Sequence, residues 1–428
     1  MKNNSFILKG NLIYSKDKDT LVSVPNGYLV CEENQCRGAF ETLPEQYADL
    51  PITDYGEQLI IPGLVDLHLH APQFAFVGMG MDMELLPWLE AYPFREEAKY
   101  RDLAYAEKRY SRFAKALASG ATTRAAVFSS LHVPATGLLM EKLEKTGIKA
   151  FVGKVNMDRN SPDSLRETTE ESARETERWI LECTEKYKNI KPILTPRFIP
   201  SCTNELMEQL GGLQKKYRLP VQSHLSENCS EIQWVSELHP ESSCYGDAYD
   251  RYGLFGGDCP TIMAHCVHSS EEEINLMQER GVYIAHCAQS NMNISSGAAP
   301  VRVYLERGMH VGLGTDVAGG FSLSVFRAMS DAVQASKLRW VLKDKSLKPL
   351  TTPEVFFMGT KGGGEFFGKV GSFEQGYEFD AVVLNDENLG GAEDLSAAQR
   401  LERLIYLSDD RNIGDKYIAG QKAEPFLM

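Results

Sequence analysis

From about residue 60 to about residue 340, short apolar runs alternate with charged stretches of helical periodicity. Charged stretches lie at residues 100–118, 163–187, 203–217, 270–280 and 322–340. The eight apolar runs are QLIIPGLVDLHLH, ATTRAAVFS, IKAFVGKVNM, KPILTPRFI, LPVQSHLS, TIMAHCVH, GVYIAHCAQ and HVGLGTDVA. Eight strand–helix units in succession are typical of a (β/α)8 barrel. We therefore predict an α/β fold with a TIM-like barrel over residues 61–367.

The two ends of the chain have a different pattern, with short strand-like runs separated by turn residues. FILKGNLIYS and GYLVCEENQ lie near the N-terminus, and GSFEQGYEFDAVVLND and KYIAGQKA lie near the C-terminus. Strand-rich ends of this kind can meet in space, because the termini of a domain are often close together. We predict that residues 1–60 and 368–428 form a small β-sandwich domain beside the barrel.

Composition limits the class of protein. The 428 residues suffice for one large barrel and an accessory domain, and 43% hydrophobic with 24% charged residues is ordinary for a globular chain. A net charge of −14 disfavours an extended phosphate-binding surface, so we expect no nucleic-acid partner. No run approaches the roughly 18 apolar residues of a membrane helix, and the start lacks the apolar core of a signal peptide.

The nine cysteines are an odd number, scattered, and without a CxxC pair. That distribution favours reduced thiols over a disulfide framework, so we expect a cytoplasmic protein.

Two histidines close the first apolar run. His68 and His70 are two residues apart, and residues two apart in a strand point to the same face of the sheet. Both imidazoles can therefore reach one metal ion. Two histidines supply only half of a metal site, so other segments must provide the remaining ligands.

Further polar residues fall near the ends of later runs, where barrel enzymes build their active sites. Arg197 follows the fourth run, His224 the fifth, His265 the sixth and Asp316 the eighth. A single histidine in an apolar strand is more often a satisfied core residue than a ligand. Several such groups at the same end of one barrel favour a functional site.

These side chains form a set suited to Zn2+ or Fe2+, with three neutral nitrogen donors and one carboxylate. The predicted metal ligands are His68, His70, His224 and Asp316. A coordination position left open for water would make the site hydrolytic. His265 would lie beside that water as a hydrogen-bond partner or fifth donor. Glu227 follows His224 by three residues and could shuttle protons without binding the metal.

The ordered pattern of HxH, His, His and Asp resembles the mononuclear aminohydrolase branch of the amidohydrolase superfamily. Within it, four segments are similar to the guanine deaminases. They are PGLVDLHLHAPQF at 62–74, ILTPRFIPSCT at 193–203, VQSHLSEN at 221–228 and GLGTDVAGGFS at 312–322. HAPQ and TPRF discriminate best, because cytosine and adenosine deaminases differ there.

The resemblance implies hydrolytic deamination of guanine to xanthine and ammonia, in purine catabolism or salvage. It also implies one zinc ion per chain, with iron as the alternative, and a homodimer. Glu227 would protonate the ring nitrogen next to the attacked carbon. Asp316 would take a proton from the nucleophilic water and relay it to ammonia, with His265 as the third catalytic residue.

Substrate contacts also follow from the resemblance. Gln73 and Arg197 would hydrogen-bond the purine, with Arg197 facing its O6/N7 edge and Phe198 lining the pocket. The remaining predicted contacts are His70, Ala71, Pro72, His224, Glu227, His265 and Asp316.

Alternatives remain open at this level. A related aminohydrolase could act on 8-oxoguanine, cytosine or a triazine, and a non-catalytic scaffold would be expected to lack metal ligands, none of which is missing. Lys154 lies where binuclear relatives can place a carboxylated lysine, but Glu227 favours a single metal. Leu67 stands where the family commonly has Thr. Trp88 and Phe94 could help close the pocket, although such residues more often pack in the core.

Overall fold

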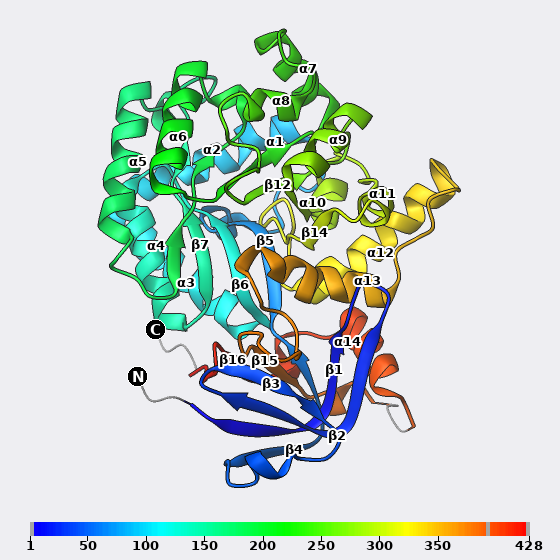
Figure 1. Cartoon of the computed structure of the whole chain (residues 1–428). Helices are drawn as coiled ribbons and strands as arrows, with labels where there is room; N and C mark the ends of the chain where they lie inside the picture. The colour runs from blue at the N-terminus through cyan, green and yellow to red at the C-terminus, as the bar shows by residue number, and fades with distance from the viewer. Residues whose placement is uncertain (1–3, 391–393, 425–428) are drawn as a thin grey trace.

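The computed structural model of the chain describes residues 4–390 and 394–424. Figure 1 shows a barrel of strands surrounded by helices, with a separate β-sheet across one end and both termini beside that sheet. The strands predicted between residues 60 and 340 form the barrel, and strands from the two ends of the chain form the separate sheet.

The barrel wall consists of two four-stranded parallel sheets. The first contains β5 (Leu64–His70), β6 (Thr122–Phe128), β7 (Lys149–Gly153) and β9 (Ile190–Pro192). The second contains β11 (Val221–Leu225), β12 (Thr261–His265), β13 (Tyr283–His286) and β14 (His310–Leu313). The short strands β8 (Val155–Asn156) and β10 (Thr195–Pro196) pair with each other beyond β7 and β9.

Backbone contacts close the wall at both seams. Leu194 and Val221 form a parallel bridge between the two sheets. At the other seam the N–H of Asp316 donates to the carbonyl of His68 at 2.8 Å. Every residue of β5 is buried, as expected of a parallel strand covered on both faces.

Helices cover the outside of the barrel. The five predicted helical stretches contain α3 (Leu103–Ser119), α5 (Thr169–Cys183), α6 (Asn204–Tyr217), α9 (Glu271–Arg280) and α12 (Val325–Leu342). Helix α3 illustrates why they form: Asp102 caps its first N–H groups, and its buried residues recur at helical spacing. The other α-helices that follow barrel strands are α1 (Leu85–Ala91), α2 (Pro93–Glu97), α4 (Val133–Thr146), α7 (Cys229–Leu238), α8 (Tyr245–Asp250), α10 (Ala288–Asn293), α11 (Val301–Glu306) and α13 (Thr352–Phe357).

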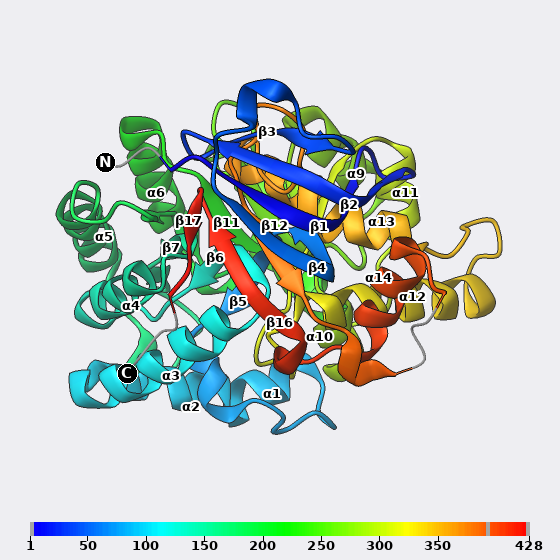
Figure 2. The same cartoon turned by 90° about the horizontal axis from the view of Figure 1, so that it is seen from below.

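Seven strands from the two ends of the chain join in one sheet, in the order β17-β16-β15-β4-β1-β2-β3. They are β1 (Phe6–Ser15), β2 (Leu21–Glu32), β3 (Gln35–Phe40), β4 (Ile52–Pro62), β15 (Ala381–Leu384), β16 (Ile413–Ile418) and β17 (Gln421–Lys422). Figure 2 shows this sheet lying across the barrel, with α14 (Ala397–Leu407) at its side. Its division into two layers, as in a sandwich, stays a prediction.

The apolar run at 58–70 serves both parts of the molecule. Strand β4 ends at Pro62 in the terminal sheet, and β5 begins at Leu64 in the barrel. The change of sheet falls at Gly63, three residues beyond the predicted boundary at residue 60. The run gives no sign of it, because residues 59–70 are all buried and apolar residues lie on both sides of Gly63.

The structure bears on the expected lack of membrane helices and on the expected state of the cysteines. Among the described residues, no helix combines the length and apolar character needed to cross a bilayer. All nine cysteines are described and are free thiols.

Candidate active site

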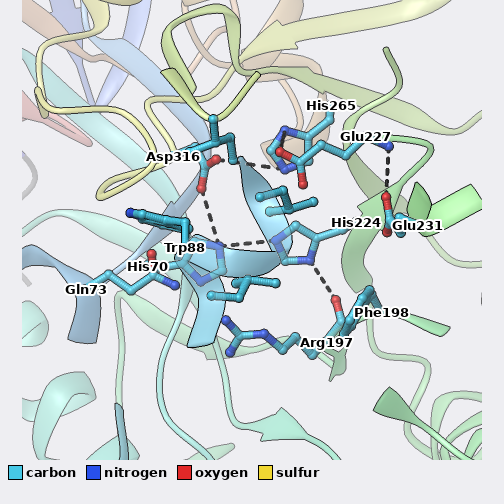
Figure 3. Close-up of a pocket in the computed structure, with 13 residues that line it drawn as sticks. His70, Gln73, Trp88, Arg197, Phe198, His224, Glu227, Glu231, His265 and Asp316 are labelled. Carbon is cyan, nitrogen blue, oxygen red and sulfur yellow. Dashed lines mark hydrogen bonds and ion pairs between the residues drawn. The ribbon is translucent and has the colours of Figure 1, made fainter. Parts of the chain in front are cut away.

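Four imidazoles and one carboxylate converge where the barrel strands end. Those strand ends lie on the side away from the terminal sheet (Figure 1), and Figure 3 shows His70, His224, His265 and Asp316 there. The Nε2 atoms of His70 and His224 lie 3.2 Å apart. Asp316 Oδ1 lies 3.2 Å from His68 Nε2 and 3.4 Å from His70 Nε2. His265 Nε2 lies 3.9 Å from the other oxygen of Asp316. The four predicted metal ligands and His265 are therefore within reach of one small ion.

The local backbone brings these side chains together. His68 and His70 are on β5, His224 on β11 and His265 at the end of β12. Gly314, just after β14, allows the last strand to approach β5, because a Cβ there would lie 2.9 Å from the Cβ of His68.

Four residues at these strand ends adopt left-handed backbone conformations that side chains rarely take. Their φ angles are 47° at Ser226, 75° at His265, 49° at Cys266 and 45° at Asp316. Strained backbone of this kind persists where the surrounding structure holds it and is concentrated at functional sites.

Hydrogen bonds fix how two of the imidazoles present their nitrogens. His224 Nδ1 donates to the carbonyl of Arg197 at 2.6 Å, and His265 Nδ1 lies 2.9 Å from Oδ1 of Asn291. Each bond leaves the Nε2 lone pair facing the cluster, which is the arrangement of metal-binding histidines. The Nε2 atoms of His68 and His265 are buried and have no hydrogen-bond partner among the described residues. These two nitrogens, whose lone pairs have no partner among those residues, are suited to bind a divalent cation.

The electrostatics of the cluster favour neutral imidazoles beside a charged carboxylate. Burial, followed by the neighbouring histidines, holds the pKa values of His70 and His224 well below their usual range. Burial alone would raise the pKa of Asp316, but His68 and His265 outweigh it and lower that pKa to about 2. Neutral histidines and an ionised aspartate are the forms that bind metal.

Glu227 lies beside the cluster without joining it. Its carboxylate accepts a hydrogen bond from the Ser296 hydroxyl at 3.1 Å and lies 3.5 Å from His265 Nδ1. Burial, then the charge of Asp316, raises its pKa well above the usual value. A carboxylic acid that keeps its proton near neutral pH is suited to general-acid work.

The backbone of Glu227 is held by a second buried carboxylate. Glu231 Oε2 accepts the N–H of Glu227 at 3.1 Å and that of Asn228 at 3.3 Å, and Oε1 accepts the Tyr245 hydroxyl at 2.7 Å. Burial raises the pKa of Glu231 to about 7. Glu231 therefore fixes the turn that carries Glu227.

A cavity of about 430 Å³ of empty space, its mouth included, opens onto these groups. Figure 3 shows Gln73 and Arg197 on one side of it and Glu227 and His265 on the other. Trp88, on α1 (Leu85–Ala91), lines the cavity and is itself fixed by a hydrogen bond to the Met79 carbonyl. The complete lining is His70, Gln73, Leu85, Trp88, Leu89, Arg197, Phe198, His224, Glu227, Glu231, His265, Ile294 and Asp316.

The polar residues opposite the histidines form a network that the sequence did not reveal. Glu97, at the end of α2 (Pro93–Glu97), accepts hydrogen bonds from Arg197 at 2.6 and 3.1 Å and from Gln73 at 3.0 Å. The guanidinium of Arg197 lies over the ring of Phe94, 5.2 Å from its centroid. Phe94 thus supports the pocket through Arg197, whereas Trp88 lines it directly.

Some predicted residues lie outside the cavity lining. Ala71 and Pro72 are buried but are not among the described residues that line it, and the Pro72 carbonyl accepts the Tyr100 hydroxyl at 2.9 Å. Lys154 is buried in an ion pair with Glu167. The polar site residues not predicted from sequence are Glu97, Glu231, Asn291 and Ser296. The apolar lining residues Leu85, Leu89 and Ile294 were not predicted either.

Comparison with known proteins identifies the family. The model of the amidohydrolase family matches residues 59–422. The chain belongs to the amidohydrolase family. Over 382 residues this amidohydrolase is 42% identical to a guanine deaminase of Mus musculus, covering 86% of the chain and 84% of the relative.

Solved structures of amidohydrolases share the fold. A guanine deaminase from C. acetobutylicum with bound guanine in the active site matches with a TM-score of 0.96 and 50% identity, covering 98% of this chain and 100% of that one. An adenosine deaminase from Xanthomonas campestris with bound zinc matches with a TM-score of 0.82 and 20% identity, covering 97% and 92%. The second match, at low identity, shows likeness of fold alone.

Proposed function

We propose that this amidohydrolase is a guanine deaminase, which hydrolyses guanine to xanthine and ammonia at the cluster of His68, His70, His224 and Asp316. The observation that carries the proposal is the cavity lining, which combines a metal-type donor set with a buried acid and two purine-type hydrogen-bonding side chains. The guanine bound in the active site of a 50% identical relative supports the choice of substrate.

We propose one Zn2+ per chain, held by these four residues, with Fe2+ as the alternative that the same donors accept. The bound zinc of the Xanthomonas protein supports the class of ion. When bound, such an ion supplies Lewis-acid chemistry and lowers the pKa of water toward neutrality.

The side chains of this chain divide the proton transfers between them. Attack at C2 of the purine places excess charge on N3, and Glu227, protonated by virtue of its raised pKa, would neutralise that charge. Asp316, ionised at neutral pH, would accept the proton of the attacking water and deliver it to the leaving ammonia. His265 would orient the water, since Asn291 fixes its ring.

The remaining lining residues would hold the base. Gln73 and Arg197 would hydrogen-bond the purine, with Arg197 toward O6 and N7, and Phe198 and Trp88 would contact its faces. The walls of this space are largely buried, which strengthens each polar contact that a bound base would make inside it.

The experiment that tests the function is an ammonia-release assay with the purified, metal-loaded chain against guanine, 8-oxoguanine, cytosine and adenine. We expect turnover of guanine well above that of the other three bases. Turnover of another base in place of guanine would move the chain to a related aminohydrolase. No turnover of any base by protein with one metal per chain would favour a non-catalytic scaffold.

The homodimer implied by the resemblance and the cytoplasmic location expected from the cysteine distribution stay predictions.

A further inference from the structure

Glu97 is a buried carboxylate that takes no part in the proposed reaction. It is 1% exposed and lies on α2, away from the strands that carry the metal-type cluster. Both of its oxygens accept hydrogen bonds, Oε2 from Arg197 Nη1, and Oε1 from Arg197 Nη2 and Gln73 Nε2. One carboxylate thus holds two side chains that both line the cavity.

The contacts of Gln73 fix which way its amide points. Its Nε2 donates to Glu97 at 3.0 Å, and its Oε1 accepts the N–H of Ala318 at 3.2 Å. Turning the amide over would set its oxygen against the carboxylate and its NH2 against a backbone donor. One N–H and one lone pair of Gln73 remain for a ligand in a single orientation.

The same carboxylate orients Arg197 and balances its charge. A guanidinium has five N–H donors, of which Glu97 engages two in a bidentate pair. The remaining N–H groups can bind only hydrogen-bond acceptors on a ligand, because a guanidinium has no acceptor atom of its own. The charge of Glu97 also allows Arg197, 3% exposed, to be buried beside a site that binds a cation.

We propose that Glu97 is a positioning residue: it holds Gln73 and Arg197 so that together they recognise the carbonyl at C6 of the purine. This inference rests on the proposed guanine deamination. With donors held in place, a 6-oxo group is accepted, and a base without an acceptor at that position leaves buried donors unpaired. Glu97 therefore determines specificity without touching the substrate.

The test uses Glu97→Gln, which keeps the shape but replaces one acceptor by a donor facing Gln73 or Arg197. Steady-state kinetics with guanine are compared with the inhibition constant of 2-aminopurine, which lacks the 6-oxo group. We expect KM for guanine to rise about 10- to 100-fold, as for loss of hydrogen bonds to a charged group. The inhibition constant of 2-aminopurine should change less than about threefold. Glu97→Asp, which keeps the charge but retracts it, should give an intermediate rise in KM.

The adjacent glutamate provides a matched control. Glu96 is also buried, but it accepts from Lys99 and Tyr105 and not from a residue lining the cavity. Glu96→Gln should leave both constants near those of the unmodified chain. Metal content and thermal unfolding are measured for every variant.

Three results would overturn the inference: equal weakening of guanine and 2-aminopurine, a change in kcat with KM unchanged, or unchanged kinetics. Failure of both Glu97 variants to fold would also overturn it, because the role would then be structural. Absence of guanine turnover in the unmodified chain would instead refute the proposed function, which separates the two failures.

Discussion

Replacing Glu227 by glutamine removes the acidic, transferable proton of its carboxyl group and changes little else. The carboxyl is 3% exposed, and burial and the charge of Asp316 raise its pKa well above the usual value, which favours the neutral acid. Glutamine is also neutral, has the same shape, and keeps an oxygen for the Ser296 hydroxyl that now lies 3.1 Å away. We expect the free energy of unfolding to change by less than about 1 kcal/mol, because that contact survives.

Catalysis should respond very differently. Loss of a positioned general acid typically costs a factor of about 10² to 10⁴, which is roughly 3 to 5 kcal/mol on the activation barrier. The cavity wall around Glu227 is buried, with Ser296, His265 and Glu231 as its polar neighbours, and none of them takes the place of the Glu227 carboxyl in the variant. We therefore expect the loss in kcat for Glu227→Gln to fall toward the upper part of that range.

The assay is ammonia release from saturating guanine, with metal content measured by elemental analysis on the same sample. Glu237→Gln is the control, because Glu237 is an exposed residue on α7, the helix that begins two residues after Glu227. It should match the unmodified chain. If Glu227→Gln keeps kcat within about tenfold while holding one metal per chain, Glu227 is not the proton donor and the reasoning from its pKa fails.

Two further predictions concern the ion and the pH. Chelation of the metal should abolish ammonia release and lower the midpoint of thermal unfolding, because the ion binds only the folded cluster. Addition of Zn2+ should restore both. A metal-free sample that stays active would contradict the metal site. Burial raises the pKa of Glu231 from 4.5 to about 7, so the folded chain holds that proton more tightly than the unfolded chain. The resulting stabilisation is complete below pH 4.5 and is lost as the pH rises through about 7, by roughly 3 kcal/mol at most. Denaturant unfolding at pH 5 and pH 8 should reveal a smaller loss in Glu231→Gln than in the unmodified chain, because Glu227, whose pKa is also raised, contributes to the loss in both. Equal losses would exclude Glu231 as a source.

The barrel could be predicted because its signal is repeated and local. Each parallel strand is covered on both faces and so reads as an apolar run, and the histidines stand out because they interrupt such runs at their ends. Side chains from β5, β11, β12 and β14 were expected at one end of one barrel, and the structure brings His68, His224, His265 and Asp316 together there.

Residues whose roles depend on distant partners could not be predicted in this way. Glu97 follows another glutamate in a short charged stretch, which reads as a solvated helix face. Its partners Gln73 and Arg197 are 24 and 100 residues away in sequence, so no local spacing indicates the contact. The change of sheet at Gly63 could not be located for a related reason, because buried apolar residues continue on both sides of it, from Leu59 to Val65.

Arg197 connects the two halves of the site, and it does so through different atoms. Its backbone carbonyl accepts the Nδ1 proton of His224 and so directs the other nitrogen of that ring to the metal-type cluster. Its side chain turns to Glu97 and the cavity. Because the carbonyl remains whatever side chain stands at this position, the orientation of His224 does not depend on the group that reads the base. The fold can therefore keep its metal chemistry while the residues around Arg197 and Glu97 set which heterocycle is accepted.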